Sequence, residues 1–592
     1  MTTTNAKSAF ADRSERELVL SVVRDDFGAT AEQIALALLR ADGLRLVEIV
    51  ARVQAAATGI RPSETEVKAN LLKLLQHNLL RIAPVATPRG TAASYSINAA
   101  EVLYRLRFPK FTELAKEAFG VEGEIIMEEI LVHGRVRMDQ SIDAMAFSLA
   151  DHERQQDAQR GADDEISESE LDENRDRIRE AFVEMAKKRY VSRVHPLDMK
   201  LPEPEETPDF PASIMRGQET DSISTAPMML EADVSAAKSR GPDDGEAEFE
   251  TEQERQSKKR KAGGGGGAKR AKLPSRGAAS AAAGNGQTDS EDSETTGAGM
   301  AENSLVWRCG VDQLLRDLRH RACIKFATEN FNHVAGVIVK AMLAHSSPHE
   351  RHHNEPLSHP VTARELFAMD DVKAALPNNV KDTWRLLLNY VTVMCRDKSG
   401  MVMKTAQEQF DATLARAGDG GQYVVHMKKI VEFLRQSTTH SYVQEKYGVQ
   451  SARIVRLLLE KRQLEEKPIG ELALLPPNDA RRRLYELYRE GLTKLQEIPK
   501  RADHNPSFTL FCWSVDVPQM EKRIAQRIQD SLTKLRRRRK AEADENKDLI
   551  ARSDQLVEAN DLAKFDKLSR ALDRLDRAII HLDNMLMLYR DF

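Results

Sequence analysis

Five residues of the chain match the pattern of a zinc-protease motif. Residues 349–353 read HERHH, which gives two histidines one helical turn apart and a glutamate that could act as a base. That chemistry needs a rigid apolar helix and a third ligand. The surrounding sequence, SSPHERHHNEPLSHP, is polar and rich in proline, so it predicts a loop. Adventitious metal binding by His349, His353 and His359 is the alternative, and we expect no dedicated metal site.

A run of five glycines, in GGGGGAKRAK (263–272), could in principle cradle a phosphate group. It lacks the GK[ST] ending of a phosphate-binding loop, and no strand precedes it. The segments expected to be ordered contain no GxSxG, no dinucleotide-binding fingerprint and no paired-carboxylate motif. We therefore expect neither a cofactor nor catalysis by this chain.

Two basic clusters flank the glycine run and have the spacing of a two-part nuclear import signal. An exposed tether that binds polyanions without specificity is the alternative, and both interpretations place the chain near nucleic acid. The residues of the clusters are Lys258, Lys259, Arg260, Lys261, Lys269, Arg270 and Lys272.

The composition indicates several globular domains and only local contact with nucleic acid. At 592 residues, of which 41% are hydrophobic and 30% charged, the chain is long enough for several packed cores. Its 88 Lys and Arg nearly balance 92 Asp and Glu, so any basic surface must be restricted to part of the molecule. The four cysteines form no CxxC pair, which fits a reducing compartment. No apolar leader or membrane-length run is present, so we expect neither secretion nor a membrane span.

Two segments interrupt the periodic sequence. Residues 201–303 are rich in Pro, Glu, Asp, Ser, Gly and Ala and have no hydrophobic period, which predicts a disordered insert. Residues 150–174 form a shorter acidic interruption between two helical patterns, and we expect a mobile loop there.

The first periodic segment has the pattern of a winged helix. Amphipathic helices are expected over 16–28 and 30–43, the second with Thr30 as its N-cap, and a third over 63–80 with a capping box of Ser63 and Glu66. The short run LRLVEIVARV separates the second helix from the third. The next segment, LLRIAPVATPRGTAASYSIN, has apolar ends around a Pro/Gly centre and predicts two short strands.

The same order of helices and terminal strands recurs three more times, with variations. We therefore expect a mainly α fold with small β wings, in which tandem winged-helix domains are followed by a C-terminal coiled-coil helical hairpin. The expected winged helices span residues 1–110, 111–200, 304–427 and 428–517, and the coiled coil spans 518–592.

The coiled coil is expected from a strict spacing of three and four between apolar residues near the C-terminus. The preceding helix, 519–540, is also amphipathic, which favours an antiparallel hairpin of this helix with the C-terminal one. The seam residues are Phe565, Leu568, Leu572, Leu575, Ile579, Leu582, Leu586 and Tyr589.

Basic residues on the third helices and wings are the candidates for DNA contact, mainly through phosphate groups. The competing interpretation is that these residues are solvated and that the winged helices bind protein. The candidates are Lys68, Lys73, Arg81 and Arg89 in the first module, Arg135, Arg137, Lys187, Lys188 and Arg189 in the second, and Lys381, Arg385, Arg396 and Lys398 in the third.

Three stretches of the N-terminal half resemble a known family: KANLLKLLQHNLL (68–80), YSINAAEVLYRLRFPKF (95–111) and EGEIIMEEILVHGR (122–135). They resemble the large winged-helix subunit, third by size, of eukaryotic RNA polymerase III, which is similar to the alpha chain of transcription factor IIE. The resemblance extends along nearly the whole chain except the insert.

The resemblance implies a nuclear, noncatalytic subunit. It implies a heterotrimer with two smaller polymerase III subunits, docking on the clamp of the largest subunit, and contact with an initiation factor. It also implies a role in binding and opening promoter DNA for the transcription of small RNAs such as tRNA and 5S rRNA. The modules alone would equally suit a free-standing DNA-binding regulator or a structural scaffold subunit of another large complex.

Overall fold

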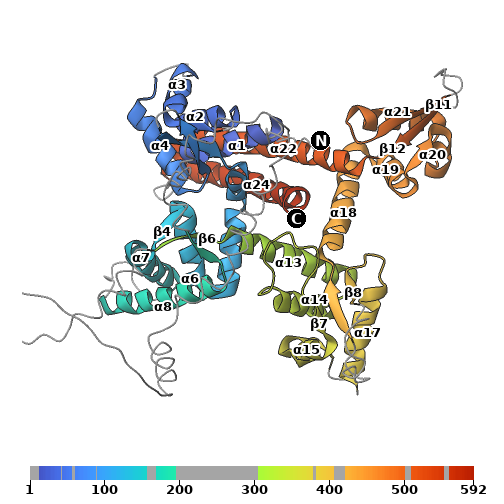
Figure 1. Cartoon of the computed structure of the whole chain (residues 1–592), viewed down its shortest axis with the longest axis horizontal. Helices are drawn as coiled ribbons and strands as arrows, with labels where there is room; N and C mark the ends of the chain where they lie inside the picture. The colour runs from blue at the N-terminus through green and yellow to red at the C-terminus, as the bar shows by residue number, and fades with distance from the viewer. Residues whose placement is uncertain are drawn as a thin grey trace, which may run out of the picture. The chain divides into compact units, whose positions relative to one another are not determined.

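The computed structural model describes residues 13–41, 43–56, 61–87, 90–156, 168–194, 305–377, 382–405, 421–499, 509–552 and 559–592. Across these residues the fold is mainly α, with four small antiparallel sheets of three strands each. In every sheet the last strand in sequence lies between the other two, so one topology occurs four times. Two compact units form, Met1–Phe111 with Val311–Phe592, and Thr112–Gly310. The expected fold class is confirmed (Figure 1).

The first module has one helix more than the sequence predicted. Its elements are α1 (Arg13–Phe27), α2 (Ala29–Leu39), β1 (Leu44–Arg45), α3 (Leu46–Ala56), α4 (Glu64–Gln76), β2 (Leu80–Thr87) and β3 (Gly90–Ile97). The run LRLVEIVARV is therefore a short strand followed by α3, which buries Ile49 and Val53 one turn apart. α4 is the third helix of the winged helix, and β2 and β3 form its wing.

The predicted cap of α2 is wrong, and the predicted capping box of α4 forms only in part. Gly28, at a φ of 91°, is the N-cap of α2. The Thr30 hydroxyl lies inside the helix and donates to Glu66 Oε1 at 2.8 Å. Ser63 caps α4 as expected, since its Oγ accepts from the Glu66 amide at 3.1 Å. Glu66 thus uses its carboxylate to join α4 to α2.

The second module is discontinuous in sequence, which corrects the predicted boundary at residue 200. Its elements are α6 (Phe108–His133), β4 (Arg135–Arg137), α7 (Met138–Gln156), α8 (Glu168–Lys187), β5 (Val191–Arg193) and β6 (Val306–Cys309). The central strand β6 follows the long insert rather than preceding it, and it pairs with both β4 and β5. The predicted acidic loop 150–174 is shorter than expected, because α7 continues to Gln156 and α8 starts at Glu168.

The third module has its own core and matches the predicted order. Its elements are α13 (Val311–Asn330), α14 (His333–Ser346), β7 (Val361–Thr362), α15 (Ala363–Ala368), α16 (Asp370–Ala375), α17 (Thr383–Arg396), β8 (Val402–Lys404) and β9 (Gln422–Val425). Thr362 and Glu365 form a complete capping box at the start of α15. α17 is the third helix, and β8 with β9 forms the wing.

The fourth module contains two helices that the sequence interpretation missed. Its elements are α18 (Met427–Tyr447), α19 (Val449–Lys461), β10 (Gln463–Glu465), α20 (Glu466–Ala473), α21 (Pro477–Arg489), β11 (Lys494–Pro499) and β12 (Thr509–Ser514). The runs MKKIVEFLRQ (427–436) and HSYVQEKYG (440–448) each have a helical pattern, but they form one helix, α18. The pattern of VQSARIVRLLLEKRQLEEK (449–467) predicts the third helix there, but the third helix is α21, because α20 and α21 lie between that segment and the wing.

The C-terminal helices form an intramolecular hairpin. α22 (Val517–Glu545) packs against α24 (Ala559–Arg590), and the short α23 (Lys547–Ala551) lies between them in sequence. α1 packs against α22, so the N-terminal helix joins the hairpin (Figure 1). Every predicted seam residue is buried or partly buried, with Leu568 and Leu586 the most deeply so.

The last turns of α24 are anchored by a buried ionic cluster. α5 (Ala99–Tyr104) leads into a 3-10 turn, η1 (Arg105–Arg107), that brings Arg107 against the hairpin. The Arg107 guanidinium is within 3.5 Å of Asp583 and 2.5 Å of Asp591, and Lys110 also pairs with Asp583. Arg435 of α18 donates to the Leu588 carbonyl at 2.5 Å. The end of α24 thus ties the first module to α18.

Some predictions fall outside the described residues. These are the insert 201–303 with all seven import-signal residues, and the DNA-contact candidates Arg89 and Lys381. Among the helices that the structure describes, none has the length and apolar character that crossing a membrane requires.

Candidate nucleic-acid interface

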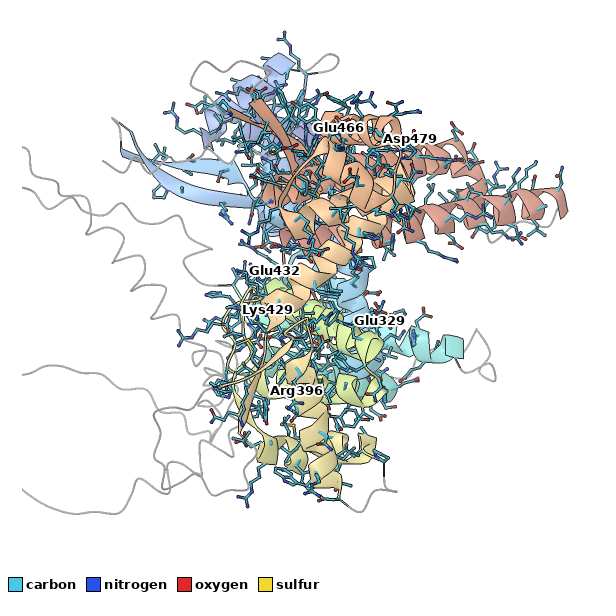
Figure 2. The ribbon with its side chains drawn as sticks, turned by 90° about the vertical axis from the view of Figure 1, so that its right-hand side faces the viewer. Glu329, Arg396, Lys429, Glu432, Glu466 and Asp479 are labelled. Carbon is cyan, nitrogen blue, oxygen red and sulfur yellow. The ribbon has the colours of Figure 1, made fainter. Side chains whose placement is uncertain are left out.

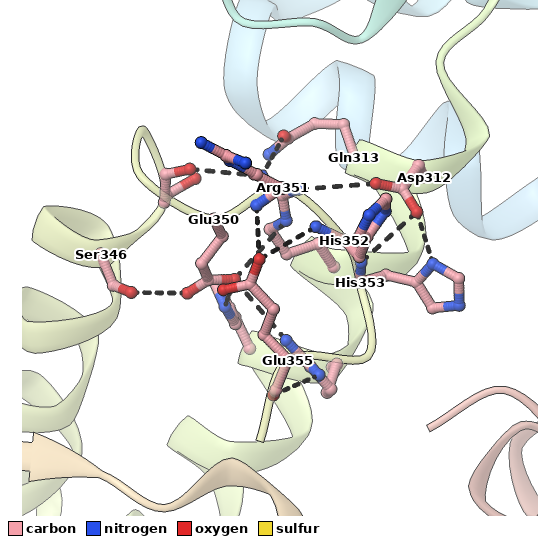
Figure 3. Close-up of polar contacts among 12 residues, drawn as sticks. Asp312, Gln313, Ser346, Glu350, Arg351, His352, His353 and Glu355 are labelled. Carbon is pink, nitrogen blue, oxygen red and sulfur yellow. Dashed lines mark hydrogen bonds and ion pairs between the residues drawn. The ribbon is translucent and has the colours of Figure 1, made fainter. Parts of the chain in front are cut away.

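The glutamate of the HERHH segment is a buried structural anchor. α14 ends at Ser346, so residues 349–353 lie in a loop (Figure 3). Glu350 is 2% exposed; its carboxylate accepts from Ser346 Oγ at 2.7 Å and contacts His320 Nε2 at 3.2 Å. Arg316 and Arg319 lie 3.5 and 3.6 Å away. Burial alone would raise the pKa of Glu350, but these partners outweigh it and lower the pKa.

The histidines of the same loop are arranged as neighbours, not as a ligand set. His353 Nδ1 lies 2.5 Å from Asp312 Oδ1 (Figure 3). The rings of His349 and His359 are 4.5 Å apart and inclined at 30°. Within the described ranges, no three His, Cys, Asp or Glu side chains are placed to hold a metal ion. Glu350 therefore holds the loop to α13 and does not face a metal site.

α17 exposes a mainly polar face that carries two arginines and one apolar residue, Val393. Asp382 caps the helix by accepting from the Arg385 amide at 3.1 Å. Leu387, Val391 and Met394 face the core. The opposite face is exposed and consists of Arg385, Asn389, Thr392, Val393 and Arg396. α17 contains no acidic residue, unlike the third helices of the other three modules.

Further lysines lie at the end of α17 and on its wing. Lys398 follows the helix, Lys404 is exposed at the end of β8, and Lys429 Nζ reaches within 3.7 Å of Met403 Sδ on β8. Figure 2 labels Arg396 on α17 and Lys429 on α18. Burial and the charge of Lys429 both lower the pKa of His426, as expected in a positive local field.

Four cations on α17, just after it and on its wing make no ion pair within the described residues. Among the described residues, no carboxylate lies within 4 Å of the charged groups of Arg385, Arg396, Lys398 or Lys404. Asp397 is the closest acid in sequence, and hydrogen bonds from the Ser399 side chain and backbone hold its pKa below the ordinary value. The surface of α17 and the wing therefore carries a net positive charge.

The candidates of the first module are exposed but more mixed in character. Lys68 and Lys73 project from α4, and Arg81 from β2. Lys68 pairs with Glu64 at 2.7 Å, one turn earlier on the same helix. Leu72 lies between the lysines in sequence and is 67% exposed. This combination of a paired lysine and an exposed leucine suits a protein surface better than a phosphate backbone.

The candidates of the second module lie in an acidic setting. Lys187 ends α8, and Lys188 pairs with Glu184 at 2.9 Å while lying over the Phe119 ring. Arg189 adopts a φ of 63° in the turn to β5, and Arg135 and Arg137 lie on β4, away from the third helix in sequence. α8 holds seven acidic residues against four basic ones. Its surface therefore disfavours phosphate contact.

Sequence reasoning missed the third helix of the fourth module and two lysines. α21 begins with Pro477 at a position that favours helix starts, and Ala480, Leu484 and Leu487 repeat at helical spacing, so the signal was available. The position of Lys404 on the wing and the contact of Lys429 with Met403 depend on the pairing of β8 with β9, which no local pattern reveals.

Comparisons with known proteins agree along the chain. The family model described as RNA polymerase III subunit RPC82 matches residues 180–434. The model described as POLR3C, C-terminal winged-helix domain, matches residues 439–515. The chain is 25% identical to DNA-directed RNA polymerase III subunit RPC3 of Bos taurus over 98% of both chains. It is 24% identical to the Homo sapiens protein over 98% of both. The Dictyostelium discoideum protein is 27% identical over 48% of this chain and 43% of its own.

Proposed function

The chain belongs to the RPC3 family of RNA polymerase III subunits, also called RPC82, and from this premise we propose that it supports promoter binding and opening through its third winged helix. It acts in the nucleus as a noncatalytic subunit, and the metal-dependent polymerisation site lies in other subunits. It forms a heterotrimer with two small subunits on the clamp of the largest subunit. The transcripts of the polymerase that contains it are small RNAs such as tRNA and 5S rRNA.

The observation that carries this proposal is that α17, unlike the third helices α4, α8 and α21, contains no acidic residue. α17 presents Arg385 and Arg396 without an acidic residue in the helix, beside the lysines of its wing. In the first module Lys68 of α4 instead pairs with Glu64, and in the second Lys188, just after α8, pairs with Glu184. Contacts to phosphate need only position and charge, so they hold DNA without reading its sequence. A subunit that retains DNA while it melts needs this kind of weak contact.

The function is tested with polymerase III purified with and without this chain. We expect both forms to elongate on a template that is already open, and only the complete enzyme to initiate on a duplex promoter with its initiation factors. Equal initiation by the two forms would refute a role in promoter opening and would favour a scaffold.

The site is tested by replacing Arg385 and Arg396 with alanine in the complete enzyme. Removing one arginine that binds a phosphate should reduce the slope of log affinity against log salt by about 1. Lys68→Ala with Lys188→Ala is the matched control, since both lysines already pair with glutamates and should leave the slope unchanged. If the control changes the slope as much as the α17 variant does, the assignment to the third module is wrong.

A further inference from the structure

The third helix of the fourth module has a surface unlike that of α17. α21 packs Ala480, Leu484 and Leu487 into the core and exposes Tyr485 and Tyr488 at 52% and 49%. These two residues are three apart, so they lie on neighbouring turns of one face. Exposed tyrosines at helical spacing are a feature of binding surfaces, because the ring supplies apolar area and the hydroxyl a hydrogen bond.

Both tyrosine rings pack against one buried tryptophan. The buried Trp513 of β12 meets the Tyr485 ring at 5.4 Å and 88°, and the Tyr488 ring at 6.0 Å and 84°. Phe511 lies two residues before Trp513 on the same strand, so it shares that face of the sheet, and it is 41% exposed. Tyr485, Tyr488 and Phe511 form what we call the aromatic strip. Binding to rings already fixed in this way costs little conformational entropy.

Arginines border the aromatic strip along α21. Arg482 lies three residues before Tyr485, and among the described residues it makes no ion pair. Arg489 follows Tyr488, is 79% exposed, and only reaches Glu490 at 4.0 Å. Arg481 is different, because Glu466 accepts from it at 2.8 Å. Two arginines are thus available for acidic groups of a partner beside a preformed apolar surface.

We propose that the aromatic strip with Arg482 and Arg489 is a docking site for an acidic, amphipathic segment of another protein chain. Carboxylates of that segment pair with the two arginines, and its apolar side chains cover Tyr485, Tyr488 and Phe511. Tyrosine and arginine are the residue types that carry most of the energy of protein interfaces. This site is separate from α17 and does not depend on DNA binding there.

A protein segment fits this surface better than duplex DNA does. Glu497 lies directly opposite Phe511 across the β11–β12 pair and is exposed. DNA carries a charge at about every 3.4 Å of each strand, so a duplex on α21 would bring phosphates toward this carboxylate. A peptide can place an apolar residue there instead. Apolar side chains of a peptide can also cover the aromatic strip, which a sugar-phosphate backbone cannot do.

The test is photocrosslinking in the assembled polymerase, with Tyr485 replaced by p-benzoylphenylalanine and the product identified by mass spectrometry. We expect crosslinks to one segment of another protein that is rich in Asp and Glu. Adding Arg482→Ala and Arg489→Ala should lower the crosslink yield about tenfold, in keeping with the cost of truncating interface arginines. The same crosslinker at Val449, exposed elsewhere in this module, is the control and should not reach that segment.

Three results would overturn the proposal: crosslinks to DNA, crosslinks confined to this chain, or a yield that the arginine variants leave unchanged. Thermal unfolding of each variant shows whether the module remains folded. If Tyr485 crosslinks fail, Tyr488 and Phe511 serve as second positions for the same crosslinker, and failure at all three equally refutes the docking site.

Discussion

Replacing Asp583 with asparagine should loosen the end of α24 more than any surface change on the hairpin. Asp583 and Arg107 are completely buried, and Lys110 is nearly so. Asparagine keeps the size of the side chain but removes its charge. Two buried cations would then face one carboxylate, that of Asp591. Burial already lowers the pKa of Lys110, and the charge of Asp583 opposes that effect, so the substitution should lower this pKa further.

The expected cost follows from the burial of the cluster. Removing one partner of a buried ion pair costs about 3–5 kcal/mol, because the remaining charge cannot be solvated. At about 1.4 kcal/mol per tenfold, local opening should become roughly 100- to 4,000-fold more frequent. The control is Asp576→Asn on the same helix. Asp576 pairs with Arg539 at 2.5 Å, but both side chains are more than 40% exposed, so its loss should cost about 0–1 kcal/mol.

Hydrogen exchange of the complete chain is the suitable assay, because a protein of several modules does not unfold in two states. Amides in the last turns of α24 and in α6 just after η1 should exchange faster in the Asp583 variant, while those of α17 should not change. If Asp583→Asn and Asp576→Asn accelerate exchange equally, the buried cluster does not anchor α24 and the reasoning fails.

Three further predictions concern the winged helices. Glu350 has a pKa below its ordinary value of 4.5, so its pairing stabilises the third module above that pH, and this stabilisation is lost as the pH falls through the lowered pKa. Hydrogen exchange at the contact between α13 and the loop should therefore become faster in acid in the native chain. In Glu350→Gln the exchange rate should depend less on pH, because His320, Arg316 and Arg319 lack the carboxylate charge that they face. Ser63→Ala should cost about 1 kcal/mol through the lost cap and speed exchange in the first turn of α4, with Ser63→Thr as the conservative control. Gly310→Ala should destabilise the second module by about 1–3 kcal/mol, because a Cβ there would overlap the Arg189 carbonyl; unchanged exchange in β6 would contradict this.

Sequence periodicity predicted the features that depend on local spacing. The seam from Phe565 to Tyr589 faces inward as its spacing of three and four requires, and Ser63 caps α4. The pairing of β6 with β4 and β5 could not be predicted, because four residues that follow a long insert carry no local sign of their partners. Thr30 was misassigned for a related reason, since its hydrogen-bond partner, Glu66, is 36 residues away.

The candidate site shows the same division between local and non-local information. The sequence analysis selected thirteen candidates for DNA contact in three modules by their charge. It could not rank them, because the sequence does not show which of the basic side chains pair with a glutamate. The structure separates Lys68 and Lys188, each of which pairs with a glutamate four residues earlier, from Arg385 and Arg396, which make no ion pair within the described residues. One topology used four times thus presents four different third-helix surfaces: mixed and partly apolar on α4, acidic on α8, basic on α17 and aromatic on α21. An acidic surface repels a phosphate backbone, and a phosphate backbone leaves exposed apolar area uncovered. We therefore expect DNA contact on α17 and protein contact on the other three helices.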